Sequence, residues 1–67
     1  PSLLTTAELK VLQYLPSHLS FPEIGQKLYL SRHTVKSQAL SAYRKLGVSS
    51  RSQAVDRAHE LGLLASR

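Results

Sequence analysis

Several residue types and patterns are missing from this 67-residue chain, and each absence removes a class of protein. There is no cysteine, which excludes disulfide bonds and metal sites built on thiolates. No run of apolar residues approaches the length of a membrane span. The three glycines are isolated from one another, so no glycine-rich loop is available to cradle a phosphate. We expect one small domain, residues 1–67, with a modest core.

Residues typical of catalysis are present but poorly placed. His18, His33 and His59 lie 15 and 26 residues apart, which matches no metal-ligand spacing. The helices expected below do not bring Asp56 and His33 together. A general acid or base also needs a pocket, which a core of this size rarely encloses. We therefore expect no enzyme, no metal site and no cofactor.

Acidic residues are few and unevenly distributed. The chain has four of them against nine Lys and Arg, with a net charge of +5 and a pI of about 10.1. Between Glu23 and Asp56 there is no acid, and this interval holds six of the nine basic residues: Lys27, Arg32, Lys36, Arg44, Lys45 and Arg51. This distribution favours an anionic partner, either nucleic acid or a membrane surface. Charge alone leaves open a solvated basic face with no partner.

Capping signals and apolar spacing predict four helices and an all-α domain without winged elements. The expected ranges are residues 6–15, 21–28, 32–46 and 51–61. Each is preceded by a Ser or Thr N-cap: Thr5, Ser20, Ser31 and Ser50. Three of these caps have a Glu or Gln three residues later, which is the capping-box spacing. Pro16 ends the first helix and Gly47 ends the third.

The second and third helices form the central pattern. Two helices joined by a short link, the second of them longer and basic, are typical of a helix-turn-helix unit. In such a unit the first helix braces the second, which enters the DNA major groove. The third helix has a narrow apolar stripe at spacings of four, three and four, which we expect to be buried: Val35, Ala39, Ala42 and Leu46.

The opposite face of the third helix is polar and contains no acid of its own. It carries His33, Lys36, Ser37, Leu40, Ser41 and Arg44. An ordinary solvated helix face would mix Glu with Lys, whereas nearby phosphates would repel a carboxylate. Leu40 has two interpretations, either a contact with a thymine methyl group or a tolerated surface leucine.

The starts of the helices offer backbone donors to an anion. At the third helix, Arg32 and Thr34 are placed to add side-chain hydrogen bonds to a phosphate. Ser31, and Ser20 at the second helix, are expected to cap the helix, and the same residues can also contact DNA. Capping and phosphate contact are compatible roles.

Short matches along nearly the whole chain, from Leu4 to about Leu63, point to one family. They include Leu4-Thr5, Glu23-Ile24, Thr34-Val35-Lys36, Lys45-Leu46-Gly47-Val48 and Arg51 with Ala54-Val55. Together and in this order, they resemble the LuxR-type (GerE- or NarL-like) helix-turn-helix domain of bacterial transcription regulators. The resemblance implies sequence-specific binding of double-stranded DNA, with the third helix in the major groove.

The resemblance also implies roles for single residues. Lys36 would contact a phosphate or a base edge, Ser37 would face the bases, and Thr34 would anchor the backbone. Arg51 would position the domain against DNA or the third helix, and Lys45 completes the basic set. Members commonly bind as homodimers through the fourth helix, where the candidate residues are Val55, Ala58 and His59.

The chain departs from the family pattern at several positions, which affects the sequence preference more than the fold. The departures are Gln38, Ala39, Ala42, Leu40 and Gly25. At Gly25 the family usually has alanine, and helix propensity predicts a cost of roughly 1 kcal/mol. The family normally attaches this domain to an N-terminal sensor, receiver or ATPase module. Because the chain begins at Pro1, we expect it to be the C-terminal part of a longer, cytoplasmic regulator.

Three alternatives compete with a LuxR-type DNA-binding regulator. A membrane-surface helix needs a larger apolar face than the third helix offers. A sigma-factor-like promoter reader shares the two-helix geometry, but the Gly47-to-Arg51 connection and the fourth helix favour the LuxR type. A helix-turn-helix scaffold used for dimerisation, or for docking on an RNA polymerase subunit, is the main alternative. RNA polymerase is also an expected further partner of the DNA-bound domain.

Overall fold

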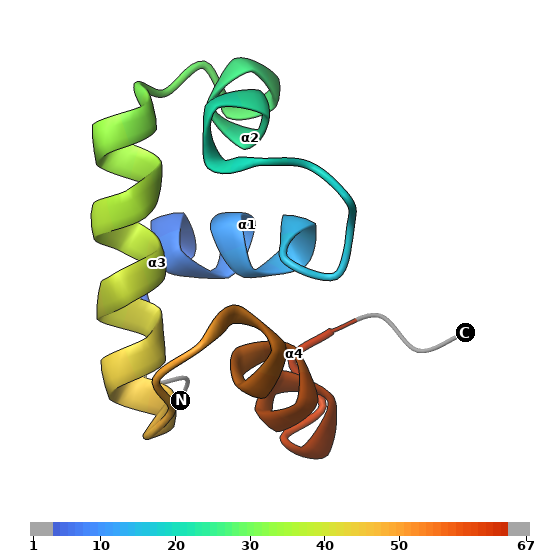
Figure 1. The fold of residues 1–67 in the computed structure, drawn as a ribbon. Coiled ribbons are helices and arrows are strands. Elements are labelled where there is room, and N and C mark those ends of the chain that lie inside the picture. Colours follow the sequence, from blue (N-terminus) through green and yellow to red (C-terminus); the bar gives the residue numbers. More distant parts are fainter. Residues whose placement is uncertain (1–3, 65–67) are drawn as a thin grey trace.

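A computed structural model describes residues 4–64 and contains four helices in that range (Figure 1). They are α1 (Thr6–Tyr14), α2 (Phe21–Leu28), α3 (Arg32–Leu46) and α4 (Arg51–Glu60). The described residues form no strand, and the all-α prediction is confirmed. Two bounds differ by one residue, because Leu15 and Leu61 are the C-caps of α1 and α4. Residues 1–3 and 65–67 of the predicted domain lie outside the described residues.

Side-chain caps set where the helices begin. Complete capping boxes join Thr5 to Glu8 and Ser20 to Glu23, as the sequence predicts. The third expected box differs. The Ser50 hydroxyl accepts a hydrogen bond from the backbone N–H of Gln53, as in a capping box. The Gln53 side chain, however, accepts its hydrogen bonds from Ser49, the residue before the N-cap. Both the backbone and the hydroxyl of Ser49 donate to Gln53, so the start of α4 is held by two serines.

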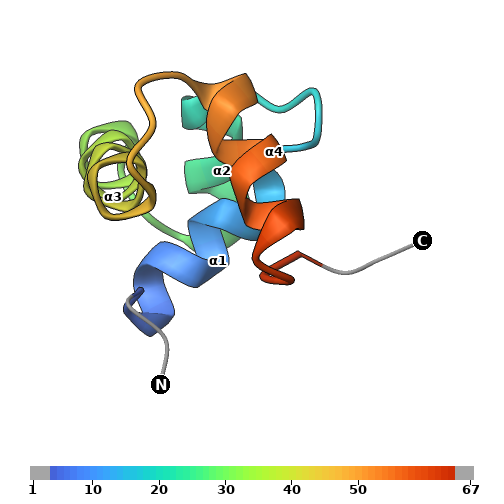
Figure 2. The ribbon, with the colours of Figure 1, turned by 90° about the horizontal axis from the view of Figure 1, so that it is seen from below.

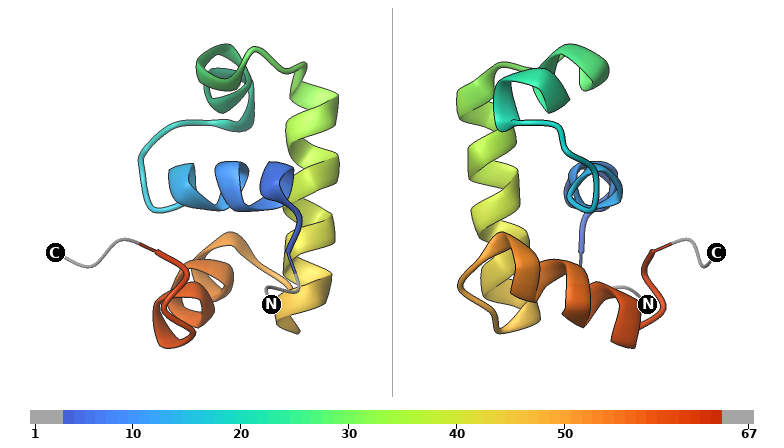
Figure 3. Two further views of the ribbon diagram at one scale, coloured as in Figure 1. Left: turned by 180° about the vertical axis from the view of Figure 1, so that it is seen from behind. Right: turned by 45° about the vertical axis from the view of Figure 1, so that its right-hand side comes forward.

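The longest helix, α3, contacts each of the other three. Viewed along its axis, α3 lies on one side of the molecule with α1, α2 and α4 on the other (Figure 2). From behind, α3 extends past α2, α1 and α4 in turn (Figure 3). Val35, Ala39 and Ala42 have no exposed surface, which confirms the predicted buried stripe. Side chains this small let neighbouring helices approach closely, so one side of α3 is rigidly seated.

The turn between α2 and α3 depends on close backbone approach. The backbone N–H of Leu30 donates to the carbonyl of Gly25 at 2.8 Å. A Cβ atom on Gly25 would lie 2.4 Å from the Leu30 carbonyl oxygen. Tyr29, between them in the turn, has the left-handed backbone with φ of 59°. Helix propensity alone therefore does not describe Gly25, because an alanine at this position requires the backbone of this turn to shift.

Candidate nucleic-acid interface

The side of α3 that faces away from the other helices is a continuous exposed surface. We call it the outer face of α3, and it consists of His33, Lys36, Ser37, Leu40 and Arg44. All five residues are exposed, as the sequence predicts, and Leu40 keeps 49% of its surface. Ser41, expected on the same face, is half-buried. The outer face thus combines two cations, two small or polar side chains and one apolar side chain on a fixed helix.

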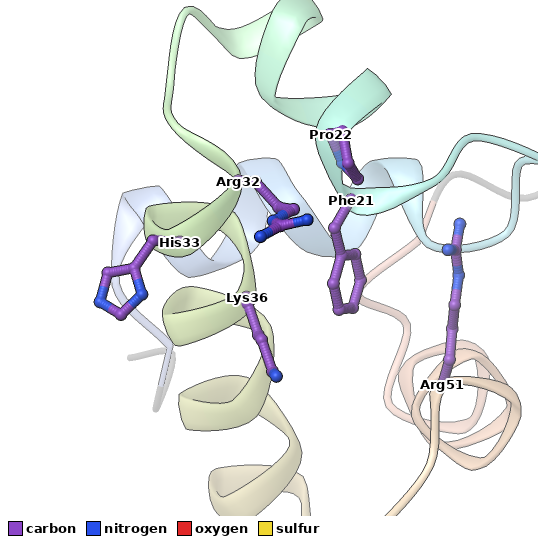
Figure 4. A pocket seen from close by; sticks show the side chains of 6 residues that line it. All are labelled: Phe21, Pro22, Arg32, His33, Lys36 and Arg51. Carbon is purple, nitrogen blue, oxygen red and sulfur yellow. The ribbon is translucent and has the colours of Figure 1, made fainter.

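A hollow of about 670 Å³ adjoins the first turns of α3. Its lining comes from α2, α3 and α4 and contains no acid: Phe21, Pro22, Arg32, His33, Lys36 and Arg51 (Figure 4). Arg32 and Lys36 extend from α3 on the side of Phe21, whereas the His33 ring extends away from it. Arg32 and Lys36, two cationic side chains beside one open hollow, make this region favourable for an anion.

A second hollow borders the other half of α3, and its chemistry is different. It is lined by residues of α1 and α3: Thr5, Glu8, Ser37, Gln38, Leu40, Ser41 and Arg44. The absence of acid that the sequence shows for α3 is thus true of the helix itself but not of its surroundings. Glu8 of α1, 33 residues from Ser41 in sequence, brings a carboxylate beside the helix.

The Glu8 carboxylate is buried and fully hydrogen-bonded. Only 3% of the residue is exposed. Its oxygens accept from Lys45 Nζ at 2.8 Å, from the Ser41 hydroxyl and from the Thr5 backbone N–H at 2.9 Å. Burial raises the pKa of Glu8, but the hydrogen bonds from Lys45, Ser41 and Thr5 and the charge of Lys45 outweigh it and lower the pKa to about 2. Glu8 is therefore ionised at neutral pH.

This arrangement changes the interpretation of two residues expected to bind DNA. The Ser41 hydroxyl and the Lys45 ammonium group are both directed at Glu8, and they join α3 to α1. The Lys45 side chain keeps 34% of its surface. Sequence reasoning missed this cluster, although the capping box did single out Glu8. Arg51 is likewise directed at backbone carbonyls at the end of α1 and at the Phe21 ring, not at α3.

Comparison with known proteins decides the family. The model for bacterial regulatory proteins of the luxR family (GerE) matches residues 2–58. The chain belongs to the LuxR family. A relative, spore germination protein GerE of Bacillus subtilis (strain 168), is 42% identical over 53 residues, which cover 79% of this chain and 72% of GerE. A solved structure of the transcription factor GerE superposes with a TM-score of 0.88 at 38% identity and covers 97% of both chains.

Other relatives are longer proteins. Transcriptional regulatory protein YdfI of Bacillus subtilis (strain 168) is 41% identical over 61 residues, which cover 91% of this chain but 29% of YdfI. The response regulator ChrA matches in structure with a TM-score of 0.86 and 35% identity, over 94% of this chain and 31% of ChrA. The chain thus spans less than a third of these two regulators. Membership of the LuxR family confirms the predicted function, DNA binding for transcription regulation.

The two helix starts of this LuxR-family domain differ as anion sites. At α2, the Glu23 carboxylate accepts from the Ser20 backbone N–H at 2.8 Å. Hydrogen bonds from Ser20 lower the pKa of Glu23, so a negative charge sits where a phosphate was expected. The first turn of α3 contains no acid. There Ser31 accepts from the Thr34 backbone N–H at 3.1 Å, and the two hydroxyls are 3.0 Å apart. The start of α3 is therefore the better anion site.

The fourth helix of this LuxR-family domain offers less surface than expected. Val55 is half-buried and His59 is exposed, but Ala58 has no exposed surface. A side chain without surface cannot contact a second copy, so Ala58 is withdrawn from the predicted interface. Its small size instead allows α4 to pack on the core.

Two kinds of site are absent from residues 4–64, the range that the structure describes. In that range no three His, Asp or Glu side chains are grouped so that they could hold a metal ion. None of the four helices combines the length and apolar character needed to cross a membrane.

Proposed function

We propose that this domain binds double-stranded DNA sequence-specifically by placing α3 in the major groove, with its outer face toward the base edges. The observation that carries this proposal is the two-sidedness of α3. Its inner stripe is fully buried, whereas its outer face is exposed and contains no acid. A helix with its side chains is about 10–12 Å across, which suits a major groove about 12 Å wide.

The outer face supplies different kinds of contact along the groove. Lys36 and Arg44 are the cations, suited to phosphate oxygens or to the acceptor edge of guanine. Ser37, one residue after Lys36, is small enough to let a base approach. Leu40 is apolar and exposed, so we assign it to a thymine methyl group.

The start of α3 supplies the proposed phosphate contact. Its first-turn backbone N–H groups lie at the positive end of the helix dipole, without a carboxylate nearby in that turn. Arg32 extends into the adjoining hollow beside Lys36 (Figure 4). Thr34 and Ser31 complete this end of the helix. A single phosphate here would fix the register of α3 in the groove.

Salt-dependent DNA binding by matched lysine variants tests the proposal. The affinity of the 67-residue chain for a duplex selected from a random pool is measured at several salt concentrations. Lys36→Ala should weaken binding by about 1–3 kcal/mol, because Lys36 is an exposed cation of the outer face beside the hollow at the start of α3. Lys10→Ala removes the same charge from an exposed site on α1 and should have little effect. A salt-independent affinity, or equal effects of the two variants, would contradict major-groove binding by α3.

We propose further that two copies pair on DNA through α4, with Val55 and His59 in the contact. Val55 lines a shallow surface hollow with Leu15, Pro16 and Asp56, so it remains accessible beside an apolar surface. Val55→Asp should reduce a two-half-site footprint to one half-site, while Arg57→Lys, at an exposed position of the same helix outside this hollow, serves as the control. A footprint of unchanged length would reject this interface. Self-association without any duplex binding would instead favour the protein-interaction alternative.

The remaining proposals concern the setting in which the domain acts. YdfI and ChrA, two of the regulators that it resembles, are longer than this chain, which supports attachment to a further module that receives a signal. We place such a regulator in the bacterial cytoplasm, on nucleoid DNA, with RNA polymerase as a further partner. Co-purification of polymerase with the DNA-bound domain, but not with the Lys36→Ala variant, is the expected result.

A further inference from the structure

One arginine connects three elements that are far apart in sequence. Arg51 is the first residue of α4. Its Nε donates to the carbonyl of Leu15 at 2.9 Å, and its Nη2 donates to the carbonyls of Tyr14 and Ser17 at 3.3 and 3.1 Å. The guanidinium carbon lies 5.8 Å from the centre of the Phe21 ring, at the start of α2. Arg51 thus joins the start of α4, the end of α1 and the start of α2.

The end of α1 has a physical need for such a partner. The last carbonyls of a helix have no donors within the helix, and they carry the negative end of its dipole. Pro16 follows the C-cap Leu15 and has no N–H to donate. The last turn of α1 also contains no basic residue. Ser17 donates to the Tyr14 carbonyl through its backbone N–H and its hydroxyl. Arg51 adds a donor to the Leu15 carbonyl and supplies the positive charge, from 36 residues away in sequence.

Through its contact with Phe21, Arg51 also holds the start of α2, the helix that packs against α3. Phe21 packs against the core at the first position of α2, the helix that braces α3. It also borders the hollow that contains Arg32 and Lys36 (Figure 4). A guanidinium group over an aromatic face is attractive, and a lysine reproduces neither this stacking nor the divergent hydrogen bonds of a planar guanidinium group. A change at Arg51 should therefore move α2 and, with it, the seat of α3.

We propose that Arg51 is a positioning residue for DNA binding, which holds the start of α2 in register with α3 and makes no contact with DNA. This inference rests on the proposed function of α3. Nε and Nη2 of Arg51 both donate to backbone carbonyls of the domain itself, so these donors are occupied and not directed at a phosphate. The resemblance to LuxR-type domains implies that Arg51 positions the domain against DNA or the third helix, whereas its donors lie against the end of α1.

Affinity and its salt dependence distinguish the two roles. Arg51→Lys keeps the charge but loses the fork of hydrogen bonds, and Phe21→Leu removes the ring but keeps apolar bulk. Each folded variant should bind the selected duplex about tenfold more weakly, because α3 is misplaced. The slope of log affinity against log salt should stay at the wild-type value, because no phosphate contact is lost. Affinity for an unrelated duplex should hardly change. Arg57→Lys, at an exposed position of α4, is the matched control.

Three outcomes overturn the inference. If a folded Arg51→Lys variant binds the selected duplex like the wild type, Arg51 positions nothing that DNA binding needs. If Arg51→Ala reduces the salt slope by about one, Arg51 contacts a phosphate directly. If Lys36→Ala also leaves binding intact, the proposed function itself fails and the inference fails with it. Circular dichroism of every variant at the assay temperature confirms that the compared species are folded.

Discussion

The two halves of α3 carry similar cations but use them differently. Lys36, in the first half, is exposed on the outer face beside an acid-free hollow. Lys45, in the second half, is bound to the buried Glu8 carboxylate, which also accepts from Ser41. The charge of Lys36 is therefore accessible to an external anion, whereas the charge of Lys45 is paired with Glu8 and joins α3 to α1. Counting cations along a helix overestimates the charge that is available for DNA.

The two halves are also seated by different forces. The first half rests on α2 through a close backbone approach, in which Gly25 meets the Leu30 carbonyl and Val35 packs nearby. The second half packs on the core through Ala42 and Leu46, and an ion pair with its hydrogen bonds also joins it to α1. Close packing is insensitive to pH, whereas an ion pair depends on the protonation of its carboxylate. The two halves should therefore respond differently to acid and to substitution.

The largest expected effect is the loss of the Glu8 charge. Glu8→Gln should lower the free energy of unfolding at pH 7 by about 3 kcal/mol, the value that a pKa depressed from 4.5 to about 2 implies. Glu60→Gln breaks the exposed pair with Arg57 and should cost less than about 1 kcal/mol. Urea titration of both variants measures the difference. Equal costs would mean that burial adds nothing to the Glu8 pair.

The same carboxylate sets the response to acid. The pKa of Glu8 is lower in the folded chain than in the unfolded chain, so its stabilisation is complete above pH 4.5. It should be lost as the pH falls from 4.5 through about 2, where the folded-state carboxylate is protonated. The thermal unfolding temperature of the wild type should fall as the pH is lowered through this range. The temperature should depend less on pH in Glu8→Gln. If Glu8→Gln kept the pH dependence of the wild type, the acid sensitivity would belong to another carboxylate.

Next in size is the contrast between Lys36 and Lys45 in DNA binding. Lys36→Ala should weaken binding by about 1–3 kcal/mol and reduce the salt slope by about one. Lys45→Ala should leave the slope unchanged and lower the stability instead, because its ammonium group serves Glu8. Fluorescence anisotropy across salt concentrations measures the slopes, and urea titration measures stability. If Lys45→Ala reduced the slope as much as Lys36→Ala, the distinction between the two halves would be lost.

The parts of this structure that sequence predicts well are those determined locally. Thr5, Ser20 and Ser31 cap helices within three residues of themselves, so the expected helix starts agree with the structure. The two sides of α3 also follow from periodicity, because burial on a helix repeats with its turn. The outer face was predictable for the same reason, although Ser41, which was expected on it, is half-buried.

The features that sequence reasoning missed depend on distant contacts. Glu8 reaches Ser41 and Lys45 across 33 and 37 residues, and a single sequence contains no sign of such a pairing. Arg51 was singled out, but its target at the end of α1 was not. Ala58 was placed in an interface because a helix face does not reveal which neighbour covers it. In each case the sequence drew attention to the residue but did not reveal which residue it contacts.

The close approach between α2 and the turn that leads into α3 can be tested at Gly25. Helix propensity predicts that Gly25→Ala stabilises α2 by about 1 kcal/mol. The structure predicts the reverse, because the new Cβ would lie 2.4 Å from the backbone oxygen of Leu30. Overpacking typically costs 1–3 kcal/mol and the propensity gain offsets about 1 kcal/mol of it, so we expect a net loss of up to about 2 kcal/mol. Gln26→Ala, at the next and exposed position, is the control and should change stability by a few tenths of a kcal/mol. A stabilised Gly25→Ala variant would show that the turn can yield.

The smallest expected effect lies in the turn that leads into the first half of α3. Tyr29 is 95% exposed and has a left-handed backbone, which glycine adopts without strain. Tyr29→Gly should raise the free energy of unfolding by about 0.5–1 kcal/mol, because the strain disappears and little packing is lost. Tyr29→Ala removes the ring but keeps the Cβ atom, so it should give no such gain. If both variants were equally stable, the backbone at Tyr29 would be unstrained, and the first half of α3 would owe its position to Gly25 and packing alone.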